Sequence, residues 1–266
     1  MIITWSKGNA DEGMPEELLL KTLQLVQKHP WWQARSKLAL VLLRHYGITA
    51  PASVLDVGCG WGVNLQALES GDYRVTGLDV SRKSLERHDA PTRSLIEADL
   101  TQDLPAPQKP FDAVLALDVI EHLDDDRSAV KRMGRLLRPQ GLALISVPAR
   151  PDLFSDFDRI QGHRRRYVPE TLRSVFEGSG LDVLNIFWWG AWQVPVLQWM
   201  RGFNASPRVR AGMVDAYQTY ANYLKLPPWP GPLFMRALYK FEQRRAVQGR
   251  LKTGTSLFAA ARLRSL

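Results

Sequence analysis

The chain has 266 residues, 45% of them hydrophobic, a net charge of +8 and one cysteine. Its length favours one α/β domain with an elaboration over two equal domains, and its one cysteine excludes an internal disulfide, which suits a reducing cytoplasm. Residues 1–5 lead into polar residues rather than an apolar leader, and no uncharged run approaches the roughly twenty residues that span a bilayer. We therefore expect a cytoplasmic protein.

Two helices are predicted ahead of the sheet, over residues 16–28 and 31–46. Both segments carry apolar residues at helical spacing, and Pro30 separates them because proline does not fit a helix interior. We therefore expect residues 1–50 to form N-terminal cap helices.

A buried apolar strand then breaks directly into a glycine turn that can open a helix, in the run 54–62, VLDVGCGWG. Gly58 and Gly60 permit backbone angles closed to other residues and leave no side chain between backbone and ligand. The helix that follows offers unpaired N–H groups to an anionic ligand. A dinucleotide fingerprint needs its third glycine at the position of Val63; here that glycine comes early, at Gly62, so an NAD-dependent oxidoreductase is a poor match.

Further strands and helices alternate along the chain up to residue 188. The segment 73–80 is typical of a strand, and it ends in Asp79, about twenty residues after the glycine turn, where a carboxylate can accept both hydroxyls of a ribose. The run 142–148 is almost wholly apolar, as in a parallel strand covered on both faces. The other predicted strands are 95–100, 111–117, 181–187 and 255–262, and the other helices are 128–137 and 169–178.

These motifs, in this order, resemble those of class I S-adenosylmethionine-dependent methyltransferases, the general methyltransferase-domain family, with similarity to ubiquinone-biosynthesis O-methyltransferases. The segment 56–62 resembles the first motif of the family, Asp79 and Asp99 match its second and third acidic positions, and 111–123 resembles its fourth motif. The resemblance covers 53–188 and 255–263 closely.

The resemblance implies an α/β, Rossmann-like fold with a seven-stranded, mostly parallel sheet whose last strand is antiparallel. The cofactor-binding core is then 51–188 together with 255–266, and 189–254 is a helical insertion between strands six and seven that is rich in basic and aromatic residues.

The cofactor that the resemblance implies is S-adenosylmethionine. Asp79 would hold its ribose and Asp99 its adenine amino group, while Cys59 would serve as a small filler with no catalytic role. Arg35 follows a Trp-Trp pair as in relatives where an arginine reaches the methionine carboxylate; a solvated arginine on a cap helix is the alternative. The predicted cofactor-binding residues are Arg35, Asp56, Gly58, Cys59, Gly60, Asp79, Val80, Asp99, Leu100, Leu117 and Asp118.

His122 and His163 are the candidate catalytic residues, because an acceptor that arrives as a hydroxyl or amine needs a base. We expect no metal. The alternative is a divalent ion on Asp118, Glu121, His122 and His163, because D-x-x-E-H with a distant histidine resembles the metal site of small-RNA 3′-terminal methyltransferases. In a third interpretation the histidines only line the pocket or cap a helix.

Two basic regions leave alternatives open. The run 164–166, three arginines, could bind a phosphate or carboxylate of the acceptor, or could be a solvated helix entry. From Arg201 onward there are twelve Lys or Arg against Asp215 and Glu242 only. The insertion could therefore be a lid or a surface for an anionic membrane face or lipid carrier, or a helical subdomain with its aromatics packed inward and its charges in water.

The leading function is methylation of oxygen on a small-molecule or a lipid- or sugar-linked acceptor. RNA ribose methylation is one alternative, and a non-catalytic S-adenosylmethionine-binding protein is another. No Asn/Asp-Pro-Pro-aromatic motif follows the fourth strand, which argues against methylation of a base amino group, and a nucleic acid is not the partner we expect. Peripheral contact with an anionic membrane stays open.

Overall fold

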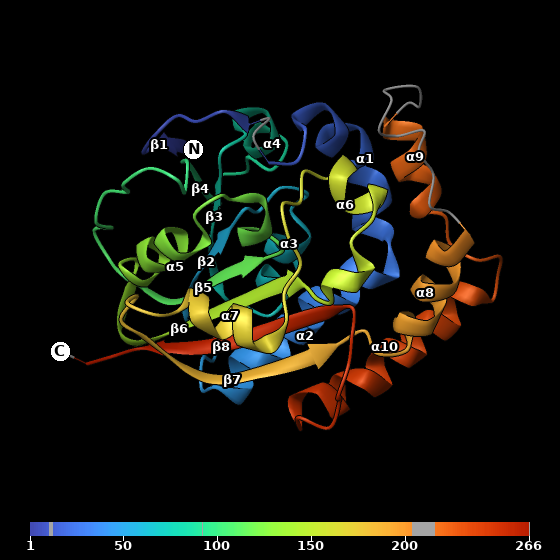
Figure 1. Ribbon diagram of the computed structural model, residues 1–266. Coiled ribbons are helices and arrows are strands. Elements are labelled where there is room, and N and C mark those ends of the chain that lie inside the picture. Colours follow the sequence, from blue (N-terminus) through green and yellow to red (C-terminus); the bar gives the residue numbers. More distant parts are fainter. Residues whose placement is uncertain (11–12, 92, 204–215, 266) are drawn as a thin grey trace.

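An eight-stranded sheet runs through the middle of the molecule with helices on both faces (Figure 1). The computed structural model describes residues 1–10, 13–91, 93–203 and 216–265. The strands lie in the order β1-β4-β3-β2-β5-β6-β8-β7. Their bounds are β1 Ile2–Thr4, β2 Ser53–Val57, β3 Arg74–Asp79, β4 Ser94–Glu97, β5 Phe111–Leu117, β6 Leu137–Pro148, β7 Leu181–Trp189 and β8 Ser256–Leu263.

Helices occupy most of the connections between these strands. The α-helices are α1 Glu16–Lys28, α2 Pro30–His45, α3 Val63–Glu69, α4 Arg82–Glu86, α5 Asp126–Gly134, α6 Asp156–Ile160, α7 Pro169–Val175, α8 Gln193–Phe203, α9 Ala216–Tyr223 and α10 Gly231–Val247. Two 3-10 turns, η2 Ile120–His122 and η3 Pro151–Leu153, follow β5 and β6.

The mostly parallel sheet with an antiparallel last strand is confirmed. Strand β8 runs antiparallel to its neighbours β6 and β7, and every other pair is parallel. The predicted count of seven strands is wrong by one, because β1 adds a parallel edge strand beside β4 and Thr4 donates its hydroxyl to Glu97 at 2.8 Å. The prediction of helices alone over 1–50 missed β1, since three residues are too few to show strand alternation.

The central strands are buried on both faces, which explains their continuous apolar sequences. Leu55 and Val57 of β2 belong to the core that α5 and α7 cover, whereas Val54 belongs to the core beneath α2 and α10. A third cluster sits above the carboxyl ends of the strands, where α1, α2, α6 and α9 meet around Tyr220. This third cluster covers the cavity that is described below.

The two predicted N-terminal helices are confirmed as α1 and α2. Helix α1 spans the predicted residues, and α2 begins at Pro30, where the fixed backbone angle of proline suits a first turn. The imidazole of His29 caps α2, because its Nδ1 accepts from the backbone N–H of Trp31 at 3.2 Å.

The insertion consists of helices α8, α9 and α10, which lie together at one side of the sheet (Figure 1). The carboxylate of Glu242 fastens α10 to the end of β7 by accepting from the backbone N–H groups of Gly190 at 3.1 Å and Trp192 at 2.9 Å. Within the described ranges no helix has the length and apolar character to cross a bilayer. Residues 204–215 of the predicted insertion, with Arg208, Arg210 and Asp215, and the last core residue Leu266 lie outside the described residues.

Candidate active site

A cavity of about 610 Å³ lies at the carboxyl ends of the parallel strands. Its floor consists of the loops that follow β2, β3, β4 and β5, and helices α1, α2, α6, α8 and α9 contribute to its walls. The strand order reverses between β2 and β5, since β3 and β4 continue one way and β6 the other. Open α/β sheets bind their ligands at such a reversal.

The glycine turn after β2 is shaped by close neighbours as much as by its ligand. Gly58 and Gly62 have φ of 66° and 71°, a region that side chains disfavour. A Cβ on Gly58 would lie 2.6 Å from Cγ2 of Val119, and one on Gly62 would lie 2.5 Å from the ring of His88. The early third glycine therefore has a physical reason in this chain, namely the packing of His88 against the turn.

Asp79 lies beside this turn with its carboxylate fixed by the backbone. Its Oδ2 accepts from the N–H of Gly60 at 2.8 Å, and its Oδ1 accepts from the N–H of Ser81 at 2.9 Å. Burial raises the pKa of the Asp79 carboxyl, although these two hydrogen bonds oppose the rise. Since a carboxylate offers about four acceptor positions, two remain for the hydroxyls of a ribose.

Asp99 occupies the end of the next strand and lines the same cavity with Leu100 and Val80. Its Oδ1 accepts from the backbone N–H of Thr101 at 2.8 Å and from the Thr101 hydroxyl at 2.7 Å. The orientation of the Asp99 carboxylate is therefore set by its own turn.

The buried Arg35 and the half-buried Asp118 form an ion pair in the cavity wall. Nη1 of Arg35 contacts Oδ2 of Asp118, whose Oδ1 accepts from the Ser146 hydroxyl at 2.8 Å. The guanidinium lies 5.2 Å from the ring of Trp31, and its Nε has no hydrogen-bond partner in the described part of the chain. Arg35 is thus a buried arginine, not a solvated one, and a guanidinium that lines the cavity suits a carboxylate ligand.

Two predicted cofactor residues lie deeper. Asp56 is fully buried below the turn and is not among the residues that line the cavity; it accepts from Nδ2 of Asn64 at 3.1 Å. Burial raises the pKa of Asp56 to about 7. Cys59 and Leu117 line the cavity, and burial raises the pKa of the Cys59 thiol well above its ordinary value. A neutral thiol is a poor nucleophile, which agrees with a filling role.

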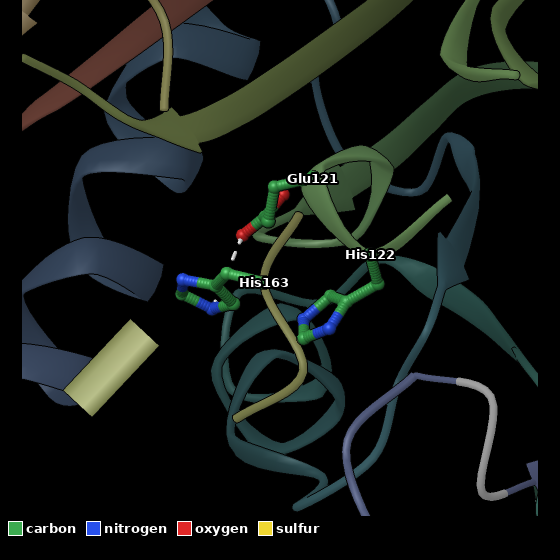
Figure 2. Close-up of side chains that lie close together, drawn as sticks. All are labelled: Glu121, His122 and His163. Carbon is green, nitrogen blue, oxygen red and sulfur yellow. Dashed lines mark ion pairs between the residues drawn. The ribbon is translucent and has the colours of Figure 1, made fainter. Parts of the chain in front are cut away.

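The structure brings His122, His163 and Glu121 together beyond Asp118 (Figure 2). The two imidazole rings meet edge to face with their centroids 4.8 Å apart, and Nε2 of His163 lies 3.9 Å from Oε1 of Glu121. Burial and the facing His163 lower the pKa of His122 to about 3. His122 is therefore neutral at ordinary pH and a weak base.

His163 is oriented by Asp158, a residue that the sequence analysis did not identify. Asp158 is fully buried, and its Oδ1 lies 3.1 Å from Nδ1 of His163 and 2.7 Å from Nε of Arg166. Burial alone would raise the pKa of Asp158, but the hydrogen bond from His163 and the charge of Arg166 hold it below its ordinary value. The ionised Asp158 orients His163 so that its Nε2 is left for another partner.

The three residues in Figure 2 also fit a divalent metal by their chemistry. Their ligand atoms lie within 4.8 Å of one another, and one carboxylate with two imidazoles is a donor set that zinc and its neighbours accept. Both oxygens of Glu121 and Nδ1 of His122 are buried without a hydrogen-bond partner among the described residues. Asp118, the fourth ligand of the predicted alternative, does not join them because Arg35 and Ser146 occupy its oxygens.

The three consecutive arginines are all paired within the chain, and Arg164 is also exposed to solvent. Arg164 pairs with Asp124, Arg165 with Asp126 at 3.3 Å, and Arg166 with Asp158. Together with the hydrogen bonds of Arg164 and Arg165 to backbone oxygens of residues 122–124, they clamp the loop after β5 to the segment before α7.

Several lining residues had no recognisable signal in the sequence. The part of the lining that the later helices contribute, named here the helical wall, includes Phe157 from α6, Leu197 from α8, and Tyr223 and Leu224 from the end of α9. Asn9 and Met14 come from the segment between β1 and α1. These positions come from distant parts of the chain and share no local sequence motif.

A parallel sheet with this strand order, a glycine turn after β2 and an acid at the end of β3 define a class I methyltransferase fold with a nucleoside site. A family model described as "Methyltransferase domain" matches residues 31–186, and the chain belongs to that family. The predicted class, enzyme type and cofactor, S-adenosylmethionine, are thereby confirmed.

The similar proteins agree with this assignment. A Mycolicibacterium smegmatis protein named "Probable S-adenosylmethionine-dependent methyltransferase" is 29% identical over 183 residues, which is 66% of this chain and 70% of that one. A ubiquinone biosynthesis O-methyltransferase of Chromobacterium violaceum is 29% identical over 137 residues, 45% of this chain and 58% of that one. The chain therefore spans little more than half the length of that relative.

Among solved structures, coclaurine N-methyltransferase bound to N-methylheliamine and S-adenosylhomocysteine has a TM-score of 0.53 at 14% identity. The match covers 86% of this chain and 72% of that one. Such a likeness establishes a shared fold and leaves the acceptor to be argued from this chain's own site.

Proposed function

We propose that the protein transfers a methyl group from S-adenosylmethionine to a hydroxyl oxygen of a small-molecule or a lipid- or sugar-linked acceptor. The observation that carries this proposal is the His163–Asp158 pair in the cavity wall. Relatives that match over part of their length include ubiquinone biosynthesis O-methyltransferases and a 27-O-demethylrifamycin SV methyltransferase, which supports oxygen as the acceptor atom.

The residues of the chain divide the work in a simple way. S-adenosylmethionine, when bound, supplies a methyl group that its sulfonium already makes electrophilic. Asp79 and Asp99, which follow the strands, and Arg35, on α2, would bind and orient it. His163, with Nδ1 on Asp158, accepts the hydroxyl proton at Nε2, while the aromatic wall with Phe157 excludes water from the acceptor.

The test has two steps. The first identifies the pool that contains the acceptor, and the second tests the base. The protein is incubated with methyl-labelled S-adenosylmethionine and a cell lysate fractionated into lipid, small-molecule, RNA and protein pools. We expect the label in the lipid or small-molecule pool. Label confined to RNA would favour the ribose alternative, and cofactor binding without label in any pool would favour a non-catalytic role.

The base is then tested with the labelled pool. His163→Gln should lower turnover by about 100-fold or more and leave the affinity for S-adenosylhomocysteine unchanged. His45→Gln, an exposed histidine on α2, is the matched control and should keep full turnover. Unchanged turnover in His163→Gln would contradict its role as the base.

A mechanism that uses a metal ion is supported by a different observation. The buried oxygens of Glu121 have no hydrogen-bond partner in the described part of the chain, and they lie beside His122 and His163. A divalent ion there would supply Lewis-acid activation of the acceptor hydroxyl. Activity that survives chelation and dialysis would exclude this version, and activity lost on chelation and restored by one divalent ion would support it.

A further inference from the structure

Helix α10 and the loop before it carry a set of large apolar side chains that no other part of the described chain covers. Trp229 is 80% exposed, Leu233 52%, Phe234 68% and Phe241 62%. Phe234 and Phe241 are seven residues apart, close to two helical turns, so they share one face of α10. A cluster of this kind on a protein surface marks a site of contact with another molecule or a membrane.

The charges on the same surface have one sign. From Lys225 to Arg250 there are six Lys or Arg against the single acid Glu242, and that acid is buried, where it accepts from the backbone N–H groups after β7. The exposed basic side chains alternate with the apolar ones, and among described residues they form no ion pairs. They are Lys225, Arg236, Lys240, Arg244, Arg245 and Arg250.

The opposite face of α10 is anchored to the body of the protein, so the exposed face is presented rigidly. Tyr239 and Ala246 belong to the core that includes α2 and the central strands. Tyr239 lies between Trp189 and Trp192, with ring centroids 5.4 Å and 5.2 Å away. The exposure of Phe234 and Phe241 is therefore not a consequence of a loosely packed helix.

We propose that the 229–245 surface, defined by Trp229, Leu233, Phe234 and Phe241 with the basic residues around them, docks on an anionic lipid bilayer. A helix lying at the interface needs bulky apolar side chains to enter the acyl boundary and basic side chains to meet anionic headgroups, and it needs no membrane-spanning length. Trp229 follows two prolines, and its ring suits the headgroup level.

A nucleic acid fits this surface less well. Single-stranded RNA is held by aromatic rings on which bases stack along a basic groove, and Leu233 contributes neither a ring nor a charge. The mixture of aliphatic and aromatic side chains with one sign of charge favours a lipid interface.

The position of the surface gives the docking a consequence for the enzyme. Leu224 lines the cavity and Trp229 belongs to the docking surface, and only the short loop between α9 and α10 separates them. Docking would therefore bring the bilayer next to the helical wall of the cavity. This proposal about the surface does not depend on which acceptor is methylated, and its test needs no turnover.

The test is co-sedimentation of the full chain with vesicles of phosphatidylcholine alone and of phosphatidylcholine with a one-third share of phosphatidylglycerol. We expect binding to the anionic vesicles only, weakened but not abolished by moderate salt. Phe234→Ser/Phe241→Ser and Arg244→Gln/Arg245→Gln should each lower the partition coefficient by about tenfold or more.

Matched controls are Leu184→Ser, an exposed leucine on β7, and Arg135→Gln, an exposed arginine after α5, which should bind as the wild type does. Affinity for S-adenosylhomocysteine, measured on every variant, shows that each has folded. The proposal is overturned if the wild type fails to bind anionic vesicles at low salt, or if the α10 variants bind them as the wild type does. Binding of a labelled single-stranded RNA that the α10 variants lose, without vesicle binding, would assign the surface to nucleic acid instead.

Discussion

The two sides of the cavity are built in different ways. On the sheet side, the loops after β2, β3 and β4 place Asp79 and Asp99 by hydrogen bonds from nearby backbone N–H groups. In the helical wall, side chains of α6 and α9 meet through packing between segments far apart in the sequence, and α8 adds Leu197 to the lining. Backbone geometry suits a ligand that never changes, whereas packed side chains can be exchanged to admit another acceptor.

The largest expected effect lies on the sheet side, in Asp79→Ala. Loss of two hydrogen bonds to a carboxylate should weaken binding of S-adenosylhomocysteine roughly 100- to 1,000-fold. Calorimetric titration measures the affinity, and the unfolding midpoint checks the fold. Asp89→Ala is the control, because among the described residues that carboxylate pairs only with the N-terminal ammonium at 2.9 Å. Near-normal affinity in Asp79→Ala would refute the ribose contact.

The glycine turn should be the part of the cavity least tolerant of added volume. Gly62→Ala adds a methyl group at φ 71° against the ring of His88 and should lower the free energy of unfolding by about 3 kcal/mol. Gly47→Ala has φ 81° with nothing within 4 Å of its new Cβ, so it reports the backbone strain alone, about 1 kcal/mol. Denaturant unfolding compares the two, and equal losses would show that His88 imposes no constraint.

The stability of the protein should depend on pH through His29, which caps α2. Burial lowers the pKa of His29 to about 4, so as the pH falls the histidine is protonated in the unfolded state before it is protonated in the folded state. The free energy of unfolding that this difference contributes is present above pH 6.5 and is lost as the pH falls toward 4. Between pH 7 and pH 5 this loss amounts to roughly 2 kcal/mol. His29→Asn keeps an acceptor for the cap of α2 and should flatten the pH dependence by that amount. The same slope in both proteins would place the acid sensitivity elsewhere.

The smallest effect on function is expected in the helical wall, from Leu197→Ala. Removal of apolar contact area should raise the KM for the acceptor about tenfold and leave the affinity for S-adenosylhomocysteine unchanged. Steady-state kinetics on the labelled pool measure KM. A matching loss of cofactor affinity would mean that α8 belongs to the cofactor site.

The difference between the two sides also decides what could be predicted from the sequence. The glycine turn, Asp79 and Asp99 follow strands whose apolar runs are recognisable, so their places at the strand ends could be predicted from the residues alone. Asp158, the pairing of Arg35 with Asp118, and the edge strand β1 could not, because each depends on contacts between segments with no shared local pattern. Asp56 had the motif but lies below the cavity, since alternate strand residues point to opposite faces.

A crystal structure of the protein with S-adenosylhomocysteine would test the central claim most directly. We predict that the ribose hydroxyls lie within hydrogen-bond reach of Asp79, the adenine beside Asp99 and the methionine carboxylate near the guanidinium of Arg35. A ligand whose ribose makes no contact with Asp79, or one that lies outside the cavity beneath α1 and α2, would contradict it.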